Sequence, residues 1–270
     1  MSLLLIQDLN FSYEDRSEIL RGINLTFDTK PTAIIGQNGA GKTTFVKLLK
    51  GLLRPTSGSI FYQETDISSL SVATLAKDIG LIFQNPNDQI FGNNVKSEVM
   101  FGPLQIGMSK QEAEKRSIDA LTLVGLSKNL TTNPYDLGLS ARKLVSIASI
   151  IAMNPQVVIF DEPTIAQDFH GKELIAKIMR ELTGQGKLVI SILHDMEFVA
   201  ENFERVIVFS QGSVLLDDTA RAVFAQKEVL EKAHLEQPCV TKLGGCIGYD
   251  QVFLTAQEFI EFHQNPRKPS

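Results

Sequence analysis

The stretch Gly36-Gln37-Asn38-Gly39-Ala40-Gly41-Lys42-Thr43 decides the fold of this 270-residue chain. It matches the pattern G-x-x-x-x-G-K-[ST], which is typical of a loop that binds phosphate groups. It follows an apolar run over residues 32–35 and precedes a segment with apolar residues on one helical face over residues 45–49. Strand, glycine-rich turn and helix are the parts that this loop needs, so the sequence predicts the start of a βαβ unit with a phosphate site.

The chemistry of the loop follows from its residue types. Glycines let successive backbone N–H groups point inward, and the following helix N-terminus adds about half a positive charge. Lys42 is predicted to bridge the β- and γ-phosphates, and the Thr43 hydroxyl to hold Mg²⁺. The predicted nucleotide contacts of the loop are Gly36, Asn38, Gly39, Ala40, Gly41, Lys42, Thr43 and Thr44.

A second element ends in two acids. The apolar run over residues 157–160 is followed by Asp161 and Glu162, at the carboxyl end of a predicted buried strand, where α/β proteins place their ligands. Asp161 fits a residue that directs Mg²⁺, and Glu162 fits the carboxylate that deprotonates the attacking water. Alone, the pair would be a solvated strand end, but beside a phosphate-binding loop it predicts hydrolysis.

Three more residues are weak signals individually, because single Gln, His and Tyr residues usually lie on the surface or pack. Gln84 follows the apolar run 79–83 and is placed to reach Mg²⁺ or the attacking water. His194 follows the run 188–192 and is placed to contact the γ-phosphate. Tyr13 is placed to stack on adenine. Their order along the chain, rather than any one of them, carries information.

That order resembles the nucleotide-binding subunit of ATP-binding-cassette (ABC) transporters over about residues 3–225. The resemblance implies that ATP and Mg²⁺ are the cofactors and that two cassettes enclose two ATP molecules head to tail. It also assigns the parts: an adenine-stacking residue, a Q-loop glutamine, a D-loop aspartate and a switch histidine, which here are Tyr13, Gln84, Asp168 and His194.

Finer features resemble one group of that family, the energy-coupling-factor ATPases of cobalt and vitamin importers. They are the runs 83–91 and 101–103, and the C-terminal residues Pro238, Thr241, Leu243, 254–255 and 258–259. The resemblance implies a C-terminal appendage that supports dimerisation and a Q-loop groove for the helices of a transmembrane partner. It also implies a separate membrane subunit that selects the substrate, and a position at the cytoplasmic face of the membrane.

One motif departs from the family. Where its members have Leu-Ser-Gly-Gly-Gln, this chain has Leu137-Gly138-Leu139-Ser140-Ala141. Gly138 lacks the hydroxyl that would reach a partner's γ-phosphate, although Ser140 is predicted to cap the following helix, 142–153, and leave a weakened anion site. The hypothesis is a heterodimer, in which a partner cassette supplies an intact signature; a homodimer would have two impaired sites.

The predicted fold class is α/β: a P-loop NTPase of the ABC type with a mostly parallel core sheet and an antiparallel β edge. Short strands are expected at residues 3–6, 10–13 and 23–27 in that edge. The predicted nucleotide-binding domain covers residues 1–225, with an inserted helical subdomain at about 88–155. Residues 226–270 form the predicted appendage, which is the expected dimer contact.

Composition excludes several classes. Hydrophobic residues make up 43% and charged residues 21%, as in globular proteins, and the net charge of −5 does not favour a nucleic-acid partner. Cys239 and Cys246 lack zinc or disulfide spacing, which indicates a reducing compartment. No run approaches the roughly 18 apolar residues of a membrane span, and residues 1–10 are expected to form a strand rather than a secretion signal.

Two other functions stay open at this stage. One is a soluble ABC-type ATPase of translation or DNA repair, although the chain lacks both a second cassette and a long coiled-coil insertion. The other is a nucleotide-gated assembly subunit with impaired hydrolysis, which the altered signature favours and the intact Glu162 and His194 disfavour.

Overall fold

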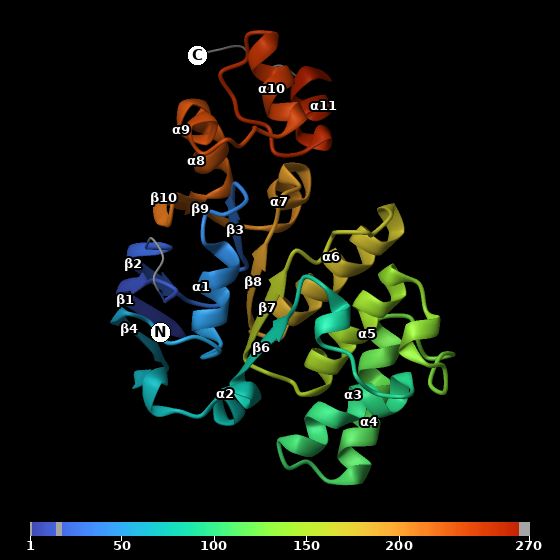
Figure 1. Cartoon of the computed structure of the whole chain (residues 1–270). Coiled ribbons are helices and arrows are strands. Elements are labelled where there is room, and N and C mark those ends of the chain that lie inside the picture. Colours follow the sequence, from blue (N-terminus) through green and yellow to red (C-terminus); the bar gives the residue numbers. More distant parts are fainter. Residues whose placement is uncertain (1, 15–17, 265–270) are drawn as a thin grey trace.

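A six-stranded sheet carries the phosphate-binding loop (Figure 1). The computed structural model describes residues 2–14 and 18–264, so the outer ends of the predicted ranges 1–225 and 226–270 lie outside it. The strand order is β10-β9-β3-β8-β7-β6, and all neighbours are parallel except β10 with β9. The strands are β3 (Thr32–Gly36), β6 (Ile79–Ile82), β7 (Val157–Asp161), β8 (Leu188–Ile192), β9 (Arg205–Ser210) and β10 (Ser213–Thr219). The predicted mostly parallel core sheet is confirmed.

The antiparallel strands form a sheet of their own, of order β2-β1-β4-β5, rather than an edge of the core sheet. They are β1 (Leu4–Phe11), β2 (Leu20–Phe27), β4 (Ser57–Tyr62) and β5 (Thr65–Asp66). The prediction of separate strands at 3–6 and 10–13 was wrong. One strand runs through both, and its pairing shifts register where Asp8 adopts a φ of 44°, which is the behaviour of a β-bulge.

Helix α1 (Lys42–Leu49) lies between the two sheets (Figure 1). Its residues Phe45, Val46, Leu48 and Leu49 are fully buried in the core cluster that also holds Ile34 of β3. The alternate residues of β3 belong to a second core cluster, beneath α5 (Leu139–Ala152), α6 (Phe169–Gly184), α7 (Met196–Asn202) and α8 (Ala220–Ala225). Burial on both faces explains why β3 reads as one apolar run.

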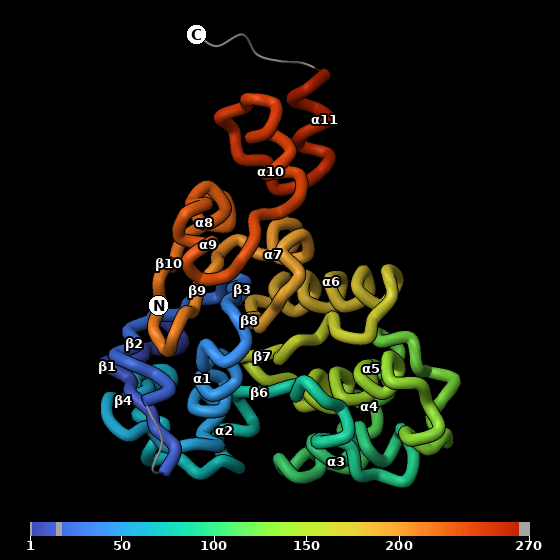
Figure 2. The backbone as a smooth tube through the Cα atoms, turned by 45° about the horizontal axis from the view of Figure 1, so that its top comes forward, coloured from blue at the N-terminus to red at the C-terminus, as the bar shows by residue number. Residues whose placement is uncertain are grey.

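Helix α2 (Val72–Asp78) lies between the second sheet and β6 along the chain, and α3 (Val95–Gln105) and α4 (Lys110–Leu123) follow β6. Helices α3, α4 and α5 pack on one another on the side of the core sheet away from β1 (Figures 1 and 2). They lie within the range 88–155, where the sequence predicts an inserted helical subdomain. That division into domains stays a prediction.

The C-terminal segment first forms a helix beside α8 and then two helices that lie beyond α7 and α8 (Figure 2). Its helices are α9 (Lys227–Lys232), α10 (Cys239–Cys246) and α11 (Ala256–Gln264). Phe253 is fully buried there, with its ring 5.3 Å from those of Phe259 and Phe262. Within residues 2–14 and 18–264, no helix has both the length and the apolar composition that crossing a bilayer requires.

We expect Phe253→Ala to loosen this segment and leave the nucleotide site intact. Removing a buried phenyl ring costs on the order of 3–5 kcal/mol, and the segment has few other large buried side chains. Hydrogen exchange should show faster exchange of the amides in α10 and α11, with exchange in β3 and α1 unchanged. Ile260→Ala is the control because Ile260 is 45% exposed; equal protection in both variants would contradict the prediction.

Candidate nucleotide site

The phosphate-binding loop has a backbone that glycine alone fits at two positions. Gly36, at the end of β3, has a φ of 155°, and a Cβ there would lie 2.3 Å from the carbonyl oxygen of Phe209. Gly41 has a φ of 98°, and a Cβ there would lie 2.7 Å from the Leu20 side chain. Between them the chain curls tightly enough for the Ala40 N–H to donate to the Gln37 carbonyl at 3.2 Å. The loop then enters α1, whose first N–H groups have no partner within the helix.

A cavity of about 650 Å³ opens over this loop, within the size range of small-molecule sites. It brings together predicted residues from five separate parts of the chain. Four of these parts follow parallel strands of the core sheet, whose carboxyl ends meet at one edge, and the fifth, Tyr13, follows β1 of the other sheet. Its predicted lining residues are Tyr13, Asn38, Gly39, Ala40, Gly41, Lys42, Thr43, Thr44, Gln84, Glu162 and His194. Asp161 lies buried beside Thr43, whereas Gly36, Gly138, Ser140 and Asp168 do not line the cavity.

Lys42 is the buried cation of the loop. Its ammonium donates to the carbonyl oxygens of Gly36 at 2.6 Å and Gln37 at 3.0 Å. Burial lowers its pKa below the ordinary value, against the opposing effect of the Glu162 and Asp161 carboxylates. A desolvated cation fixed among inward-facing amides favours a strongly anionic ligand.

Thr43 and Asp161 supply oxygens suited to a magnesium ion. The Thr43 hydroxyl donates to the Asp161 carboxylate at 3.5 Å. Burial raises the pKa of Asp161, and the Thr43 hydrogen bond opposes that shift. Mg²⁺ prefers oxygen ligands and is usually held by one or two protein groups together with substrate phosphates. This hydroxyl and carboxylate, beside the phosphate-binding loop, fit that requirement.

Glu162 has a partner on each carboxylate oxygen. The Gln84 amide donates to Oε2 at 2.7 Å, and Nε2 of His194 lies 2.9 Å from Oε1. The backbone of Glu162 has a φ of 48°, and its N–H donates to the Ile192 carbonyl at 3.1 Å. Non-glycine residues persist in such sparsely populated conformations where the surroundings hold them, often at functional sites. The sheet therefore presents this carboxylate in one orientation toward the cavity.

Gln84 and Tyr13 contact neighbours that the sequence does not reveal. The Gln84 amide contacts Glu162, and its predicted contact with Mg²⁺ stays a prediction. Tyr13 is 37% exposed, with its ring edge-to-face on Phe11 at 4.8 Å. It lines the cavity, and stacking on adenine likewise stays a prediction.

The signature region differs from expectation at its helix start. Gly138 is the N-cap of α5, which begins at Leu139, so the prediction that Ser140 caps this helix was wrong. The Ser140 hydroxyl instead donates to the Gln167 side-chain oxygen at 2.7 Å. Asp168 accepts a hydrogen bond from the Gly171 N–H at 2.8 Å and so caps α6. The segment at the start of α5 is thus bonded to the loop that precedes α6 in the same chain.

Sequence reasoning missed Lys143, which lies one turn into α5 and is 2% exposed. Its ammonium donates to the carbonyl oxygens of Phe83 at 2.8 Å and Gln84 at 2.6 Å, and lies 3.5 Å from that of Asp161. Burial lowers its pKa to about 8, while the carboxylates of Asp161 and Glu162 oppose the shift. The position of a lysine among apolar helix residues could have indicated a buried role. The sequence does not reveal its partners, because they are backbone carbonyl oxygens about 60 residues away.

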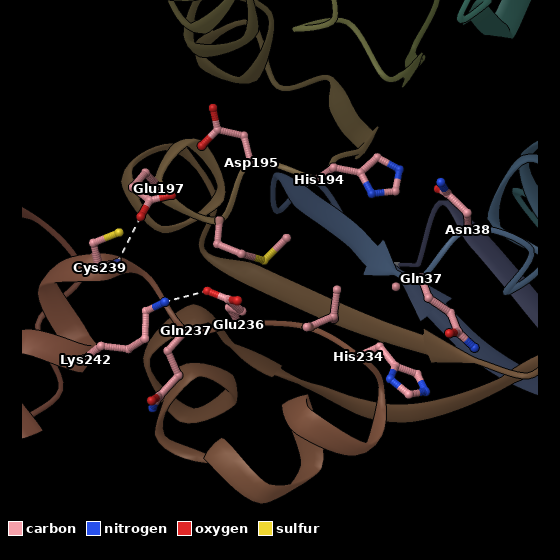
Figure 3. Close-up of a pocket in the computed structure, with 13 residues that line it drawn as sticks. Gln37, Asn38, His194, Asp195, Glu197, His234, Glu236, Gln237, Cys239 and Lys242 are labelled. Carbon is pink, nitrogen blue, oxygen red and sulfur yellow. Dashed lines mark hydrogen bonds and ion pairs between the residues drawn. The ribbon is translucent and has the colours of Figure 1, made fainter.

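A second groove of about 640 Å³ lies on the other side of His194, between the loop and the C-terminal segment (Figure 3). Gln37, Asn38 and His194 line one part of it. In the other part, Glu197 of α7 accepts a hydrogen bond from the Cys239 N–H at 2.9 Å. The C-terminal segment is therefore bonded to the helix that directly follows His194.

The fold and this arrangement define a P-loop ATPase: a phosphate-binding loop, a buried acid beneath it and an oriented carboxylate beside it. The family model described as "ABC transporter" matches residues 20–165. The chain belongs to the ABC transporter family, as one of its ATP-binding domains.

Relatives along most of the chain carry two kinds of name. The energy-coupling factor transporter ATP-binding protein EcfA of Methanocaldococcus jannaschii is 38% identical over 88% of this chain and 86% of its own length. A putative ABC transporter ATP-binding protein of Methanosarcina acetivorans is 42% identical over 89% of this chain, which spans 39% of that relative's length.

Solved structures agree with the fold. The structure of cbiO1 from Clostridium perfringens, described as part of the ABC transporter complex cbiONQ, has a TM-score of 0.76. It is 32% identical and covers 91% of this chain and 98% of its own. A dimeric bacterial ABC transporter cassette matches with a TM-score of 0.74 at 26% identity, over 81% of this chain and 99% of its own.

Proposed function

We propose that this chain is the ATP-binding subunit of an energy-coupling-factor type ABC importer, which hydrolyses MgATP to drive uptake of a vitamin or a metal ion. The observation that carries the proposal is the Glu162 carboxylate, held by Gln84 and His194 at the edge of the Lys42 loop. The names of the relatives, energy-coupling factor transporter ATP-binding proteins, support the assignment to that group.

The proposal gives the residues of the site the following roles. Glu162 takes the proton of the attacking water, and His194 holds the carboxylate and contacts the γ-phosphate. Lys42 and the loop amides bind the phosphates, while Thr43 and Asp161, with Gln84 beside them, hold Mg²⁺. The ion neutralises charge on the phosphate oxygens when it is bound.

The proposed partners are a second ABC ATPase subunit, a transmembrane coupling subunit and a substrate-binding membrane subunit, at the cytoplasmic face of the membrane. Phe91 is 61% exposed and Phe101 44%, with their rings edge-to-face at 4.7 Å. Both follow Gln84 in the chain, on the side where the proposal places the coupling helices, and exposed aromatic pairs are favoured at interfaces. Residues 226–270 are the proposed dimer contact.

Co-expression tests the assignment to a transporter. The chain should purify with a transmembrane subunit encoded beside it, and Phe91→Ser together with Phe101→Ser should abolish that capture with basal ATP hydrolysis unchanged. Hydrolysis with no membrane partner would favour the soluble ATPase instead. A partner bound without hydrolysis would favour the nucleotide-gated assembly subunit.

The altered signature predicts asymmetric turnover. In a head-to-tail dimer, the segment at Gly138 contacts the ATP bound by the partner. Because Gly138 stands where the family has a serine, a homodimer lacks the serine hydroxyl at both ATP sites. We expect pairing with a cassette that has an intact signature, or the triple change Gly138→Ser, Leu139→Gly and Ser140→Gly, to raise turnover at least about tenfold, since one such donor is worth about 10²–10³ in kcat. Phosphate release measures it.

Ser140→Gly alone serves as the control, because it removes the bond to Gln167 without restoring the hydroxyl at position 138. The asymmetry would be contradicted if the isolated wild-type chain hydrolysed ATP as fast as the heterodimer and the triple variant.

A further inference from the structure

Lys143 joins two strand ends that carry different parts of the proposed site. Its ammonium bonds to the backbone of Phe83 and Gln84, directly after β6, and approaches the Asp161 carbonyl, at the end of β7. An ammonium has three donors, and three carbonyl oxygens surround it here. Lys143, on helix α5, therefore bridges the carboxyl ends of two neighbouring strands, β6 and β7.

The two strand ends meet again through side chains. Gln84 donates its amide to Glu162 at 2.7 Å, and Glu162 directly follows Asp161. The bonded path runs from the Lys143 ammonium to the Gln84 backbone, through its side chain to the Glu162 carboxylate, and back through Asp161. Because the carboxylate sits on a backbone with a φ of 48°, its orientation depends on such external contacts.

We propose that Lys143 is a positioning residue for hydrolysis: it fixes the backbone of Gln84 relative to Asp161 so that the Gln84 amide orients Glu162. The inference rests on the proposed function, because it concerns the carboxylate assigned as base. Lys143 does not line the nucleotide cavity, so the inference predicts an effect on turnover rather than on binding.

Lys187 provides a matched comparison at the opposite end of the same sheet. It is 5% exposed and donates to the Pro155 carbonyl at 2.5 Å, just before β7 begins. Both lysines are buried cations bonded to backbone carbonyls, and burial lowers the pKa of each. They differ in which ends of the strands they hold, so a general packing role predicts similar effects for both.

The experiment compares steady-state hydrolysis by the full chain with Lys143→Met, Lys143→Arg and Lys187→Met. Displacement of a reacting group by about 1 Å costs about 10²-fold, so Lys143→Met should lower kcat about 10²-fold and change the KM for MgATP less than about threefold. Lys143→Arg, which keeps charge and donors, should recover at least about tenfold of that loss. Lys187→Met should lower the melting temperature and leave kcat within about twofold.

A double-mutant cycle separates positioning from stability. If Lys143 acts through Gln84, Lys143→Met should lower kcat by no more than about threefold in a Gln84→Ala background, because residues that act as a unit are not additive. An undiminished effect in that background would overturn the inference, as would Lys143→Met hydrolysing at the wild-type rate. Should Lys143→Met fail to fold, Lys143→Gln, with a shorter N–H donor, gives the same two readouts.

Different results contradict the proposed function and the positioning role of Lys143. The proposed function is contradicted if the wild type hydrolyses ATP no faster than Glu162→Gln. The positioning role alone is contradicted if Glu162→Gln is inactive while Lys143→Met is fully active.

Discussion

Glu162→Gln should lower kcat for phosphate release about 10²–10⁴-fold, the usual contribution of a general base. In the wild type, the Gln84 amide donates to the Glu162 carboxylate at 2.7 Å. The change keeps the shape of the side chain and an oxygen that can accept this hydrogen bond. It removes the ability to take a proton from water. The affinity for MgATP should change by less than about threefold, because the Lys42 loop is unaltered.

Glu173→Gln is the matched control. Glu173 is an exposed carboxylate on α6, outside the cavity, and pairs with His170 at 3.9 Å. It should keep wild-type turnover. Hydrolysis by Glu162→Gln at the rate of this control would contradict the assignment of Glu162 as the base.

Lys42→Met should weaken MgATP binding about 10²-fold or more. Charge-assisted hydrogen bonds contribute about 1.5–3 kcal/mol each, and the Lys42 ammonium is the cation buried within the loop. Titration calorimetry measures the affinity. Lys47→Met, on the same helix but outside the cavity, should bind as the wild type does; equal affinity of both variants would contradict the role of Lys42.

The core of the site was predictable because its signals are local. The glycines and Lys42 all lie within residues 36–43, and their spacing reflects how backbone amides must curl, a property of the segment itself. Asp161 and Glu162 likewise end an apolar run. That Gln84 and His194 meet at Glu162 follows from parallel strands ending at one edge, which the alternation of strands and helices indicates.

The contacts that sequence reasoning missed join residues that are distant in the chain. Lys143 bonds to backbone oxygens 59 and 60 residues away, and a backbone acceptor has no residue type to read. Ser140 is a good capping residue by type, yet α5 begins at Leu139 and its hydroxyl bonds to Gln167. The sequence predicted antiparallel strands near the N-terminus but not that β1, β2 and β4 form a separate sheet. The separation of this sheet from the core sheet depends on α1, which packs between the two sheets.

The central claim is that the amides around Lys42 hold a triphosphate whose terminal group lies beside Glu162. A crystal structure of the Glu162→Gln variant with MgATP tests this most directly. We predict the γ-phosphate against the Lys42 ammonium, with the side chain at position 162 one water molecule away. A nucleotide bound elsewhere, or a γ-phosphate out of reach of position 162, would contradict the account.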